Sequence, residues 1–252
     1  MTLEHTLERT LTILAKRETV FRFFTDTPRW EKWWGKGSTV DPRPGGKVRI
    51  LYPGAIEVTG EVLEVSEPER ISFTYGFTSG SPIPPGSSRV TISLAEQGSA
   101  TKLTLVHEFS DAAVRDDHIQ GWRYQLSLFS NIVSDEVNVG VAEFVDAWNE
   151  SWANPDAGER EKTFRRIATP AVQFRDKYST LDGIDDVLAH VTAAQRFMPG
   201  VRLERQGDVR QCQGRAYCNW NASANGKPIG SGSTFFVLDA DGRIEAATGF
   251  WS

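Results

Sequence analysis

The most constraining feature of the sequence is a series of short alternating segments in the first half of the chain, which no helical pattern interrupts. Five such segments follow one another at intervals of about ten residues and are separated by Gly, Pro or Ser clusters. They are GKVRILY, IEVTGEVLEV, RISFTYGF, SSRVTISLAE and ATKLTLVHEF. Because strands spaced so closely leave no room for crossover helices, they predict a meandering antiparallel sheet.

A long amphipathic helix is predicted directly after this sheet, from Ala113 to about Glu136. Apolar residues recur in this segment at helical spacing: Val114, Ile119, Trp122, Leu126, Phe129 and Val133. One strand, LERTLTILAK, and a short helical segment, RETVFRFF, precede the sheet. This order predicts a helix-grip arrangement, in which the long helix packs across an antiparallel sheet.

The pattern then restarts, so we place a domain boundary near residues 137–140 and expect two domains, 1–136 and 140–252. The second part begins with helical periodicity over residues 141–152 and a capped start in NPDAGEREKTF. A strand AVQFRDKY, a helix GIDDVLAHVTAAQRF and four closing strands follow. The sequence therefore predicts two α+β domains in tandem.

Composition and charge exclude several classes of function. The net charge of −5 leaves no basic excess of the kind that binds nucleic acid or an anionic membrane. No stretch is apolar enough to span a membrane, and the charged start MTLEHTLERT lacks the apolar run of a signal peptide. We therefore expect a cytoplasmic protein that binds neither nucleic acid nor membranes.

The sequence carries no recognisable metal or cofactor motif. It contains no Walker sequence, no dinucleotide fingerprint after a first strand and no G-x-S-x-G elbow. The four histidines are scattered without metal-ligand spacing. Cys212 and Cys218 flank a predicted turn without lying opposite one another, so free thiols are favoured over a disulfide. We expect neither a metal nor a cofactor.

Asp176 is the candidate catalytic residue. In AVQFRDKY the period of two places Val172, Phe174, Asp176 and Tyr178 on one face of a strand. A carboxylate on such an apolar face is desolvated, which favours its neutral form and suits a general acid or base. A second interpretation stays open, in which Asp176 lies at a strand end, reaches solvent or caps a turn.

Two histidines and a tryptophan are candidate ligand contacts. In TKLTLVHEF the same alternation turns His107 inward with its apolar neighbours, and Trp122 lies near the expected mouth of the helix-grip cavity. A histidine there can orient a ligand by hydrogen bonding, but without a partner carboxylate it supports no particular reaction. His190, in DDVLAHV, is open to two interpretations: a boundary histidine of the core, or a contact that faces the sheet.

The first part of the chain resembles a known superfamily. The segments ETVFRFFTDTPRWEKWW, DPRPGGKVRI, GEVLEVSEPERISFTY, TKLTLVHEF and GWRYQLSLF stand in the order and spacing of SRPBCC (START-like) proteins. Within that superfamily, residues 3–135 are similar to the branch named after the activator of the heat-shock-protein ATPase. The resemblance implies a sheet that curls around the long helix and encloses a cavity.

The second part resembles the nuclear-transport-factor-2-like superfamily in its SnoaL-like branch. The resemblance rests on FVDAWNESW, AVQFRD, LDGIDDVLAH and FFVLDADGRIEAATGFW, within residues 138–252. It implies a cone-shaped α+β barrel of curved antiparallel sheet closed by three helices, with a cavity inside the cone. It also raises the expectation of a homodimer formed through the sheet of this domain.

Counting residues from the segments that carry the second resemblance assigns cavity positions in this chain. Trp220, Phe236 and Trp251 would face the interior of the cone, and Asp176 would stand where a ketosteroid-isomerase-like member carries its base. Where that member has oxyanion donors, this chain has Thr234 in one place and Phe144 or Trp148 in the other. The isomerase activity therefore does not transfer, although Trp148, Tyr178, His190 and Thr234 remain candidate ligand contacts.

Three functions follow as expectations. The first is a protein that binds small hydrophobic or aromatic molecules, with one cavity per domain and no assigned reaction. The second is a cofactor-independent cyclase, isomerase or dehydratase that uses Asp176 as general base, for which the missing oxyanion donors are unfavourable. The third takes the family name literally and makes the first domain a partner of a chaperone ATPase, although a fold alone does not carry a function.

Overall fold

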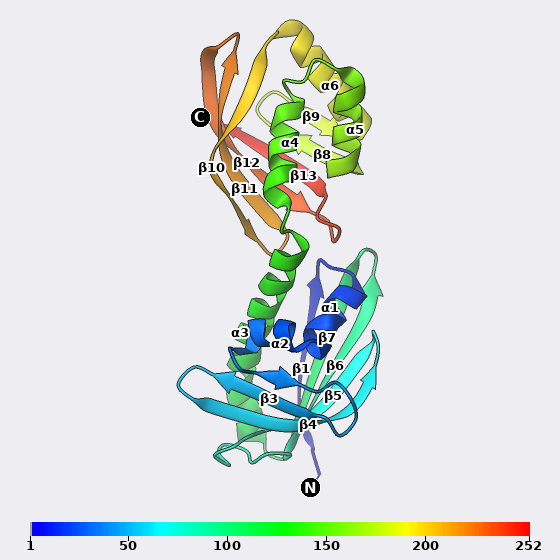
Figure 1. The fold of residues 1–252 in the computed structure, drawn as a ribbon, viewed down its shortest axis with the longest axis vertical. Helices are drawn as coiled ribbons and strands as arrows, with labels where there is room; N and C mark the ends of the chain where they lie inside the picture. The colour runs from blue at the N-terminus through cyan, green and yellow to red at the C-terminus, as the bar shows by residue number, and fades with distance from the viewer. Residues whose placement is uncertain (1) are drawn as a thin grey trace. The chain divides into compact units, whose positions relative to one another are not determined.

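The computed structural model describes residues 2–252 (Figure 1), and the chain divides into two compact units between Ser134 and Asp135. Each unit has its own sheet, one of seven strands and one of six. No helix among the described residues is long and apolar enough to cross a membrane. The predicted α+β class is confirmed for both halves of the chain.

The first unit is an antiparallel sheet with two short helices and one long one. Its strands stand in the order β1-β7-β6-β5-β4-β3-β2. The elements are β1 (His5–Ile13), α1 (Arg17–Thr25), α2 (Thr27–Trp34), β2 (Thr39–Val40), β3 (Lys47–Tyr52), β4 (Ile56–Ser66), β5 (Arg70–Phe77), β6 (Ser88–Gln97), β7 (Ala100–Phe109) and α3 (Ala112–Val137). The five predicted strands of the meander and the long helix all form.

Strict alternation along β7 shows why this sheet has one buried face. Leu103, Leu105, His107 and Phe109 are fully buried, whereas Lys102 just before them is exposed and the residues between them are half-buried. The long helix α3 has a buried stripe of its own, which includes Trp122, Leu126 and Phe129. The period of two on the strand and the helical period on α3 thus generate the same apolar core from opposite sides.

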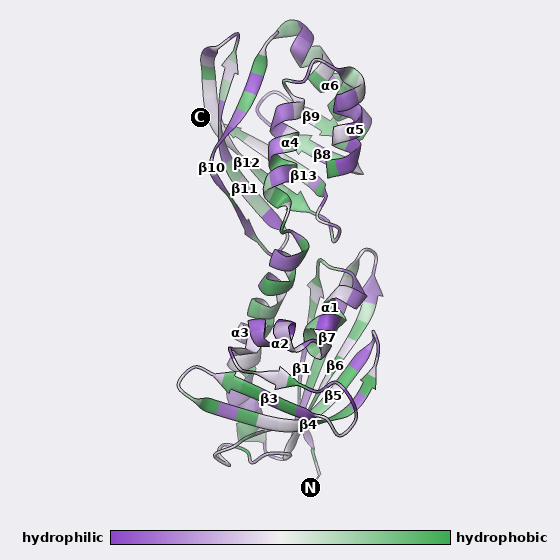
Figure 2. Ribbon diagram, in the orientation of Figure 1, coloured by the Kyte–Doolittle hydropathy of each residue, from purple (hydrophilic) through white to green (hydrophobic). Residues whose placement is uncertain are grey.

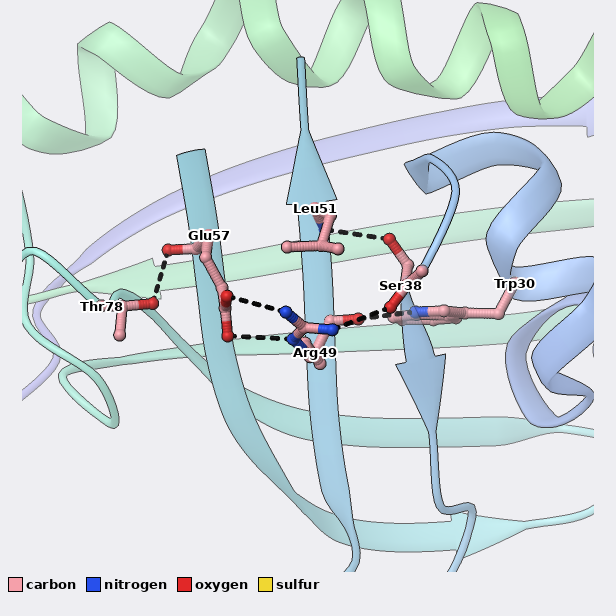
Figure 3. Close-up of polar contacts among 7 residues, drawn as sticks. Trp30, Ser38, Arg49, Leu51, Glu57 and Thr78 are labelled. Atoms are coloured by element: carbon pink, nitrogen blue, oxygen red, sulfur yellow. Dashed lines mark hydrogen bonds and ion pairs between the residues drawn. The ribbon is translucent and has the colours of Figure 1, made fainter. Parts of the chain in front are cut away.

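Polar contacts fix α2 and the following β2 to the edge of this sheet (Figure 3). The Trp30 indole donates to the Arg49 carbonyl oxygen over 3.3 Å, and the Leu51 amide donates to Ser38 Oγ over 2.9 Å. Arg49 also holds Glu57 on the neighbouring strand through two hydrogen bonds of 3.0 Å each. These contacts position the end of α2, which carries Trp34.

The second unit packs three helices on one side of a six-stranded sheet (Figure 1). The strand order is β10-β11-β12-β13-β8-β9, so the sheet is open, with β10 and β9 at its edges. The elements are α4 (Val141–Ser151), α5 (Ala157–Ile167), β8 (Ala168–Arg175), β9 (Thr180–Asp182), α6 (Ile184–Phe197), β10 (Val201–Cys212), β11 (Arg215–Ala224), β12 (Lys227–Leu238) and β13 (Ile244–Trp251). β13 pairs with β8 in parallel, and the other neighbours are antiparallel.

Capping and a buried guanidinium arrange the helices of this unit. Asp156 caps α5, because its side chain accepts the Glu159 amide over 3.0 Å. α5 is largely hydrophilic (Figure 2), and one of its charged side chains, Arg160, is buried instead of facing solvent. The Arg160 guanidinium donates to the Asn154 carbonyl oxygen, to Gln195 Oε1 and to Thr192 Oγ1, which ties α5 to α6.

The two cysteines lie near one end of the same sheet, and both are free thiols, as the sequence predicted. Cys212 is exposed at the end of β10, whereas Cys218 is buried on β11. Burial raises the pKa of the Cys218 thiol.

Candidate functional site

A cavity of about 760 Å³ lies within the second unit, and we call it the second-unit cavity. Its wall is dominated by aromatic rings contributed by helices, strands and one turn. They are Trp148, Trp152, Phe174, Tyr178, Phe197, Trp220 and Trp251. The ring pairs meet edge to face or tilted, for example Trp220 and Trp251 at 4.8 Å between centroids. Such a wall suits an apolar or ring-containing molecule.

Asp176 lies in this wall at the end of β8, where the chain leaves the sheet. Its Oδ1 accepts the Tyr178 amide over 2.8 Å, and its backbone N–H donates to the Ser179 carbonyl oxygen over 3.0 Å. Its Oδ2 accepts the Trp251 indole over 3.1 Å. Asp176 is partly buried. Its carboxylate contacts the turn through Tyr178 and the last strand through Trp251, and it also borders the cavity.

The turn that Asp176 closes also changes the position of Tyr178. Alternation predicted that Tyr178 shares the inward face of the strand, but β8 ends at Arg175 and Asp176 begins a tight turn instead. Tyr178 is 68% exposed as a result. It still borders the second-unit cavity, with its ring 5.7 Å from that of Trp251.

His190 reaches the same cavity from α6. Its Nε2 lies 3.1 Å from Ser179 Oγ, and its ring meets the edge of Trp152 at 5.8 Å. The hydrogen bond joins the helix to the turn that follows Asp176. His190 is therefore a boundary histidine that also lines the cavity.

Trp220 and Thr234 form a buried pair on the sheet side of the cavity. The Trp220 indole donates to Thr234 Oγ1 over 2.9 Å. The ring crosses the neighbouring strand at Gly232, where an added Cβ would lie 2.6 Å from the indole. The same Cβ would lie 2.2 Å from the Phe250 carbonyl oxygen, so a side chain there would collide with the backbone of β13 as well as with Trp220.

Of the predicted contacts in this unit, Phe236 alone does not line the cavity. It is fully buried and packs against Trp148 at 6.1 Å, so it belongs to the core behind the wall. Trp152 and the segment around Phe197 line the cavity but were not predicted. Trp152 follows Trp148 by four residues, a helical spacing that places both on one face and could have identified it.

The first unit contains a smaller cavity of about 410 Å³, which we call the first-unit cavity. It lies beside α3, with wall residues that include Trp34, Tyr52, Tyr75, His118 and Trp122. The hydroxyl oxygens of Tyr52 and Tyr75 are 3.3 Å apart. Burial raises the pKa of Tyr52 to about 12, so both phenols keep their protons at neutral pH.

His107 corrects the prediction of a ligand contact in this cavity. It is fully buried and inward, as alternation predicted, but it does not line the cavity. Its Nδ1 accepts the Trp122 indole over 2.9 Å, and its Nε2 lies 2.8 Å from Ser88 Oγ, which donates to the Tyr75 carbonyl oxygen. Both ring nitrogens are therefore used inside the protein, and the imidazole is neutral with its proton on Nε2.

Two polar atoms beside the first-unit cavity have no partner within the described residues. They are the Trp34 indole nitrogen and His118 Nε2, both buried. The other nitrogen of His118 lies 2.7 Å from the Val114 carbonyl oxygen, so it donates and leaves Nε2 as an acceptor. The wall of this cavity also carries the polar side chains of Tyr52, Tyr75, Asp117 and Gln125.

The buried histidines predict a pH dependence for the stability of the first unit. Burial, with a smaller effect of His118, lowers the pKa of His107 well below 6.5. Burial also lowers the pKa of His118. Their unfolded forms take up protons below about pH 6.5 while the folded forms do not, so stability is full above that pH and is lost as pH falls.

Between pH 7.5 and pH 5.5 we expect this unit to lose about 1 kcal/mol or more of unfolding free energy. Hydrogen exchange followed by mass spectrometry across a urea series separates peptides of β6 and β7 from those of the second unit. An unchanged urea midpoint for the β6 and β7 peptides at the two pH values would contradict the neutral assignment of His107.

Comparisons with known proteins support the two-part organisation. Residues 14–134 match the family described as Activator of Hsp90 ATPase homolog 1-like protein. No curated relative matches the sequence.

Solved structures resemble about half of the chain each. A protein from Agrobacterium tumefaciens, described as a member of the SnoaL-like family, is 19% identical and covers 46% of this chain and 98% of its own, with a TM-score of 0.42. A Mesorhizobium loti protein is 20% identical, with 52% and 97% covered and a TM-score of 0.47. One from Chromobacterium violaceum is 26% identical, with 50% and 94% covered and a TM-score of 0.42.

The family match agrees with the resemblance that the sequence predicted for the first part of the chain. The chain is a two-domain fusion whose first part, residues 14–134, matches the Activator of Hsp90 ATPase homolog 1-like family.

Proposed function

We propose that the protein binds a small hydrophobic or aromatic molecule in the second-unit cavity, and that the first-unit cavity is a second site of the same general kind. The observation that carries the proposal is the size and lining of the second-unit cavity. About 760 Å³ lies within the range of sites that enclose small organic ligands. Its wall combines many rings with few polar groups, which is the usual composition of such sites.

Ordinary core packing does not account for a space of this size. Protein interiors are packed as densely as organic crystals, and unfilled apolar space lowers stability in proportion to its volume. Behind the wall the same unit has a core closed to solvent, in which Phe164 and Phe236 are fully buried. The cavity beside this core is therefore better explained as a binding site than as a packing defect.

An enzymatic function is the second candidate, and Asp176 is the observation that favours it. Its carboxylate lies in the cavity wall, where a general base would reach a bound molecule. Hydrogen-bond donors for an oxyanion are few, because Phe144 has none and Thr234, whose Oγ1 accepts the Trp220 indole, has a single hydroxyl proton to donate. Binding without an assigned reaction is therefore the better supported function.

Blocking the second-unit cavity tests the proposal. Ala194 lies on α6 and lines the cavity, so Ala194→Phe would fill part of it without removing any wall residue. We expect the affinity for a neutral fluorescent probe, N-phenyl-1-naphthylamine, to fall at least about tenfold, because the new ring occupies the space of the ligand. Fluorescence titration of the full chain measures the change.

Ala189→Phe is the matched control for this experiment. Ala189 lies on the same helix but is exposed and does not line the cavity. It should leave probe affinity within about twofold of the original protein, as an exposed substitution usually does. Equal probe affinity in all three proteins, or no binding to any of them, would sink the proposal for this cavity.

A further inference from the structure

The charges around the second-unit cavity are unbalanced. Among the residues that line it, Asp176 is the sole acidic side chain, and none is a lysine or an arginine. His190 is the remaining nitrogen base, and its Nε2 is held by Ser179 Oγ at 3.1 Å. A ligand in this cavity therefore meets one carboxylate and no fixed positive charge.

The Asp176 carboxylate is bound by neutral groups alone. Its two oxygens accept the Tyr178 amide and the Trp251 indole. No ion pair to Asp176 exists within residues 2–252. A carboxylate has about four acceptor positions, so about two remain for a further donor.

The basic residues nearest in sequence, Arg175 and Lys177, line a separate hollow that also includes Asp176 and Trp251. Arg175 pairs with Asp182 on β9 at 2.5 Å. The Lys177 ammonium lies 5.4 Å from the centre of the Tyr178 ring, in a cation–π contact. Neither residue lines the cavity, so neither neutralises Asp176 from within it.

Two aromatic residues adjoin this carboxylate: Trp251, whose indole N–H donates to Oδ2, and Tyr178, whose amide donates to Oδ1. Trp251 and Tyr178 lie at 5.7 Å with their planes at 72°, and Trp220 continues the group at 4.8 Å from Trp251. Ring faces attract cations, most strongly those of tryptophan. The carboxylate gives this end of the cavity the complementary charge for an ammonium group, while the apolar wall beyond it accepts a hydrocarbon or aromatic body.

We propose that the second-unit cavity selects protonated aromatic amines over neutral molecules of the same shape, with Asp176 as the counter-ion. This inference rests on the proposed binding function and adds the class of ligand. The ammonium donates to the free acceptor positions of Asp176 and contacts Trp251, and the aromatic body packs against Trp148 and Phe174. Because two of its acceptor positions are already filled, Asp176 is held in one orientation before the ligand arrives.

A matched pair of probes tests the selection. 4-Phenylbutylamine and 4-phenylbutan-1-ol have the same body, but the amine is protonated at pH 7.5, since alkylammonium groups titrate near pH 10. Isothermal titration calorimetry with the full chain at low salt should show at least about tenfold tighter binding of the amine, because its hydrogen bond is charge-assisted. In Asp176→Asn the amine should lose this advantage while the alcohol changes by less than about threefold.

Asp208→Asn provides the control for net charge. Asp208 belongs to the same unit but does not line this cavity, so the substitution removes the same charge at a distance. It should leave the preference for the amine in place, because separated surface charges are screened.

The outcomes separate the two proposals. If the alcohol binds as well as the amine, or if Asp176→Asn keeps the preference, amine selection is overturned and the binding function stands. If neither probe binds the original protein, both are overturned. A preference that Asp208→Asn removes equally would show a general charge effect and would also overturn the role of Asp176.

Discussion

Replacing His107 with alanine is expected to lower the unfolding free energy of the first unit by about 3–5 kcal/mol, one of the largest effects of any single substitution in this unit. The ring is 0% exposed, so its removal leaves a cavity that the surrounding sheet cannot fill. It also leaves the Trp122 indole and the Ser88 hydroxyl without the partners they have at 2.9 and 2.8 Å. Unsatisfied buried groups add their own cost to that of the cavity.

Lys102→Ala is the control for this substitution. Lys102 lies on the same strand, on the exposed face, and its replacement should change the unfolding free energy by about 0.5 kcal/mol or less. Hydrogen exchange across a urea series, read on peptides of β6 and β7, measures both variants in the full chain. A His107→Ala protein as stable as Lys102→Ala would show that the hydrogen bonds of His107 contribute little to the fold.

Alternation predicted where His107 points but not what it does. The direction of a side chain on a strand follows from its neighbours, so TKLTLVHEF was sufficient to place the ring inside. Its partners come from β6 and α3, and no local pattern pairs Ser88 or Trp122 with it. A histidine predicted to contact a ligand therefore has a structural role, because contacts between distant segments depend on the tertiary packing.

Asp176 and Tyr178 show the limit of the same method in the second unit. The alternation holds as far as β8 extends, and it fails at the residue where the backbone turns. The turn depends on hydrogen bonds of the Asp176 side chain and backbone, one of the interpretations that the sequence left open. The sequence thus identified the carboxylate and its cavity, whereas the exposure of Tyr178 required the structure.

The cavity walls differ in how far they could be predicted. Trp220, Thr234 and Trp251 come from regular strands whose inward faces could be counted, and all three line the second-unit cavity. The contribution of Phe197 comes from the end of α6, where no periodicity remains to indicate a direction. Counting along strands thus identified inward faces, but it also included Phe236, which lies behind the wall, and it could not reach the end of α6.

Trp148 is the residue whose loss should most affect the second unit. It is 2% exposed and contacts Phe164, Phe174 and Phe236 at 5.2, 5.9 and 6.1 Å between ring centres. Trp148→Ala should lower the unfolding free energy of this unit by about 3–5 kcal/mol, because the removed indole leaves space that helix and sheet cannot close. Peptides of α4 and β12, followed by hydrogen exchange across a urea series, report the loss.

Phe235→Ala is the matched control, since Phe235 is also aromatic but lies on the opposite face of β12 and is 40% exposed. Its replacement should cost about 1 kcal/mol or less, because less apolar area is removed from a buried position.

The comparison with Ala194→Phe then separates two roles of the same cavity wall. Ala194→Phe should weaken ligand binding with little loss of stability, whereas Trp148→Ala should destabilise the unit whether or not a ligand is present. If Trp148→Ala instead leaves the unfolding free energy unchanged and only weakens binding, Trp148 belongs to the site alone, and the core of this unit lies entirely behind the ring.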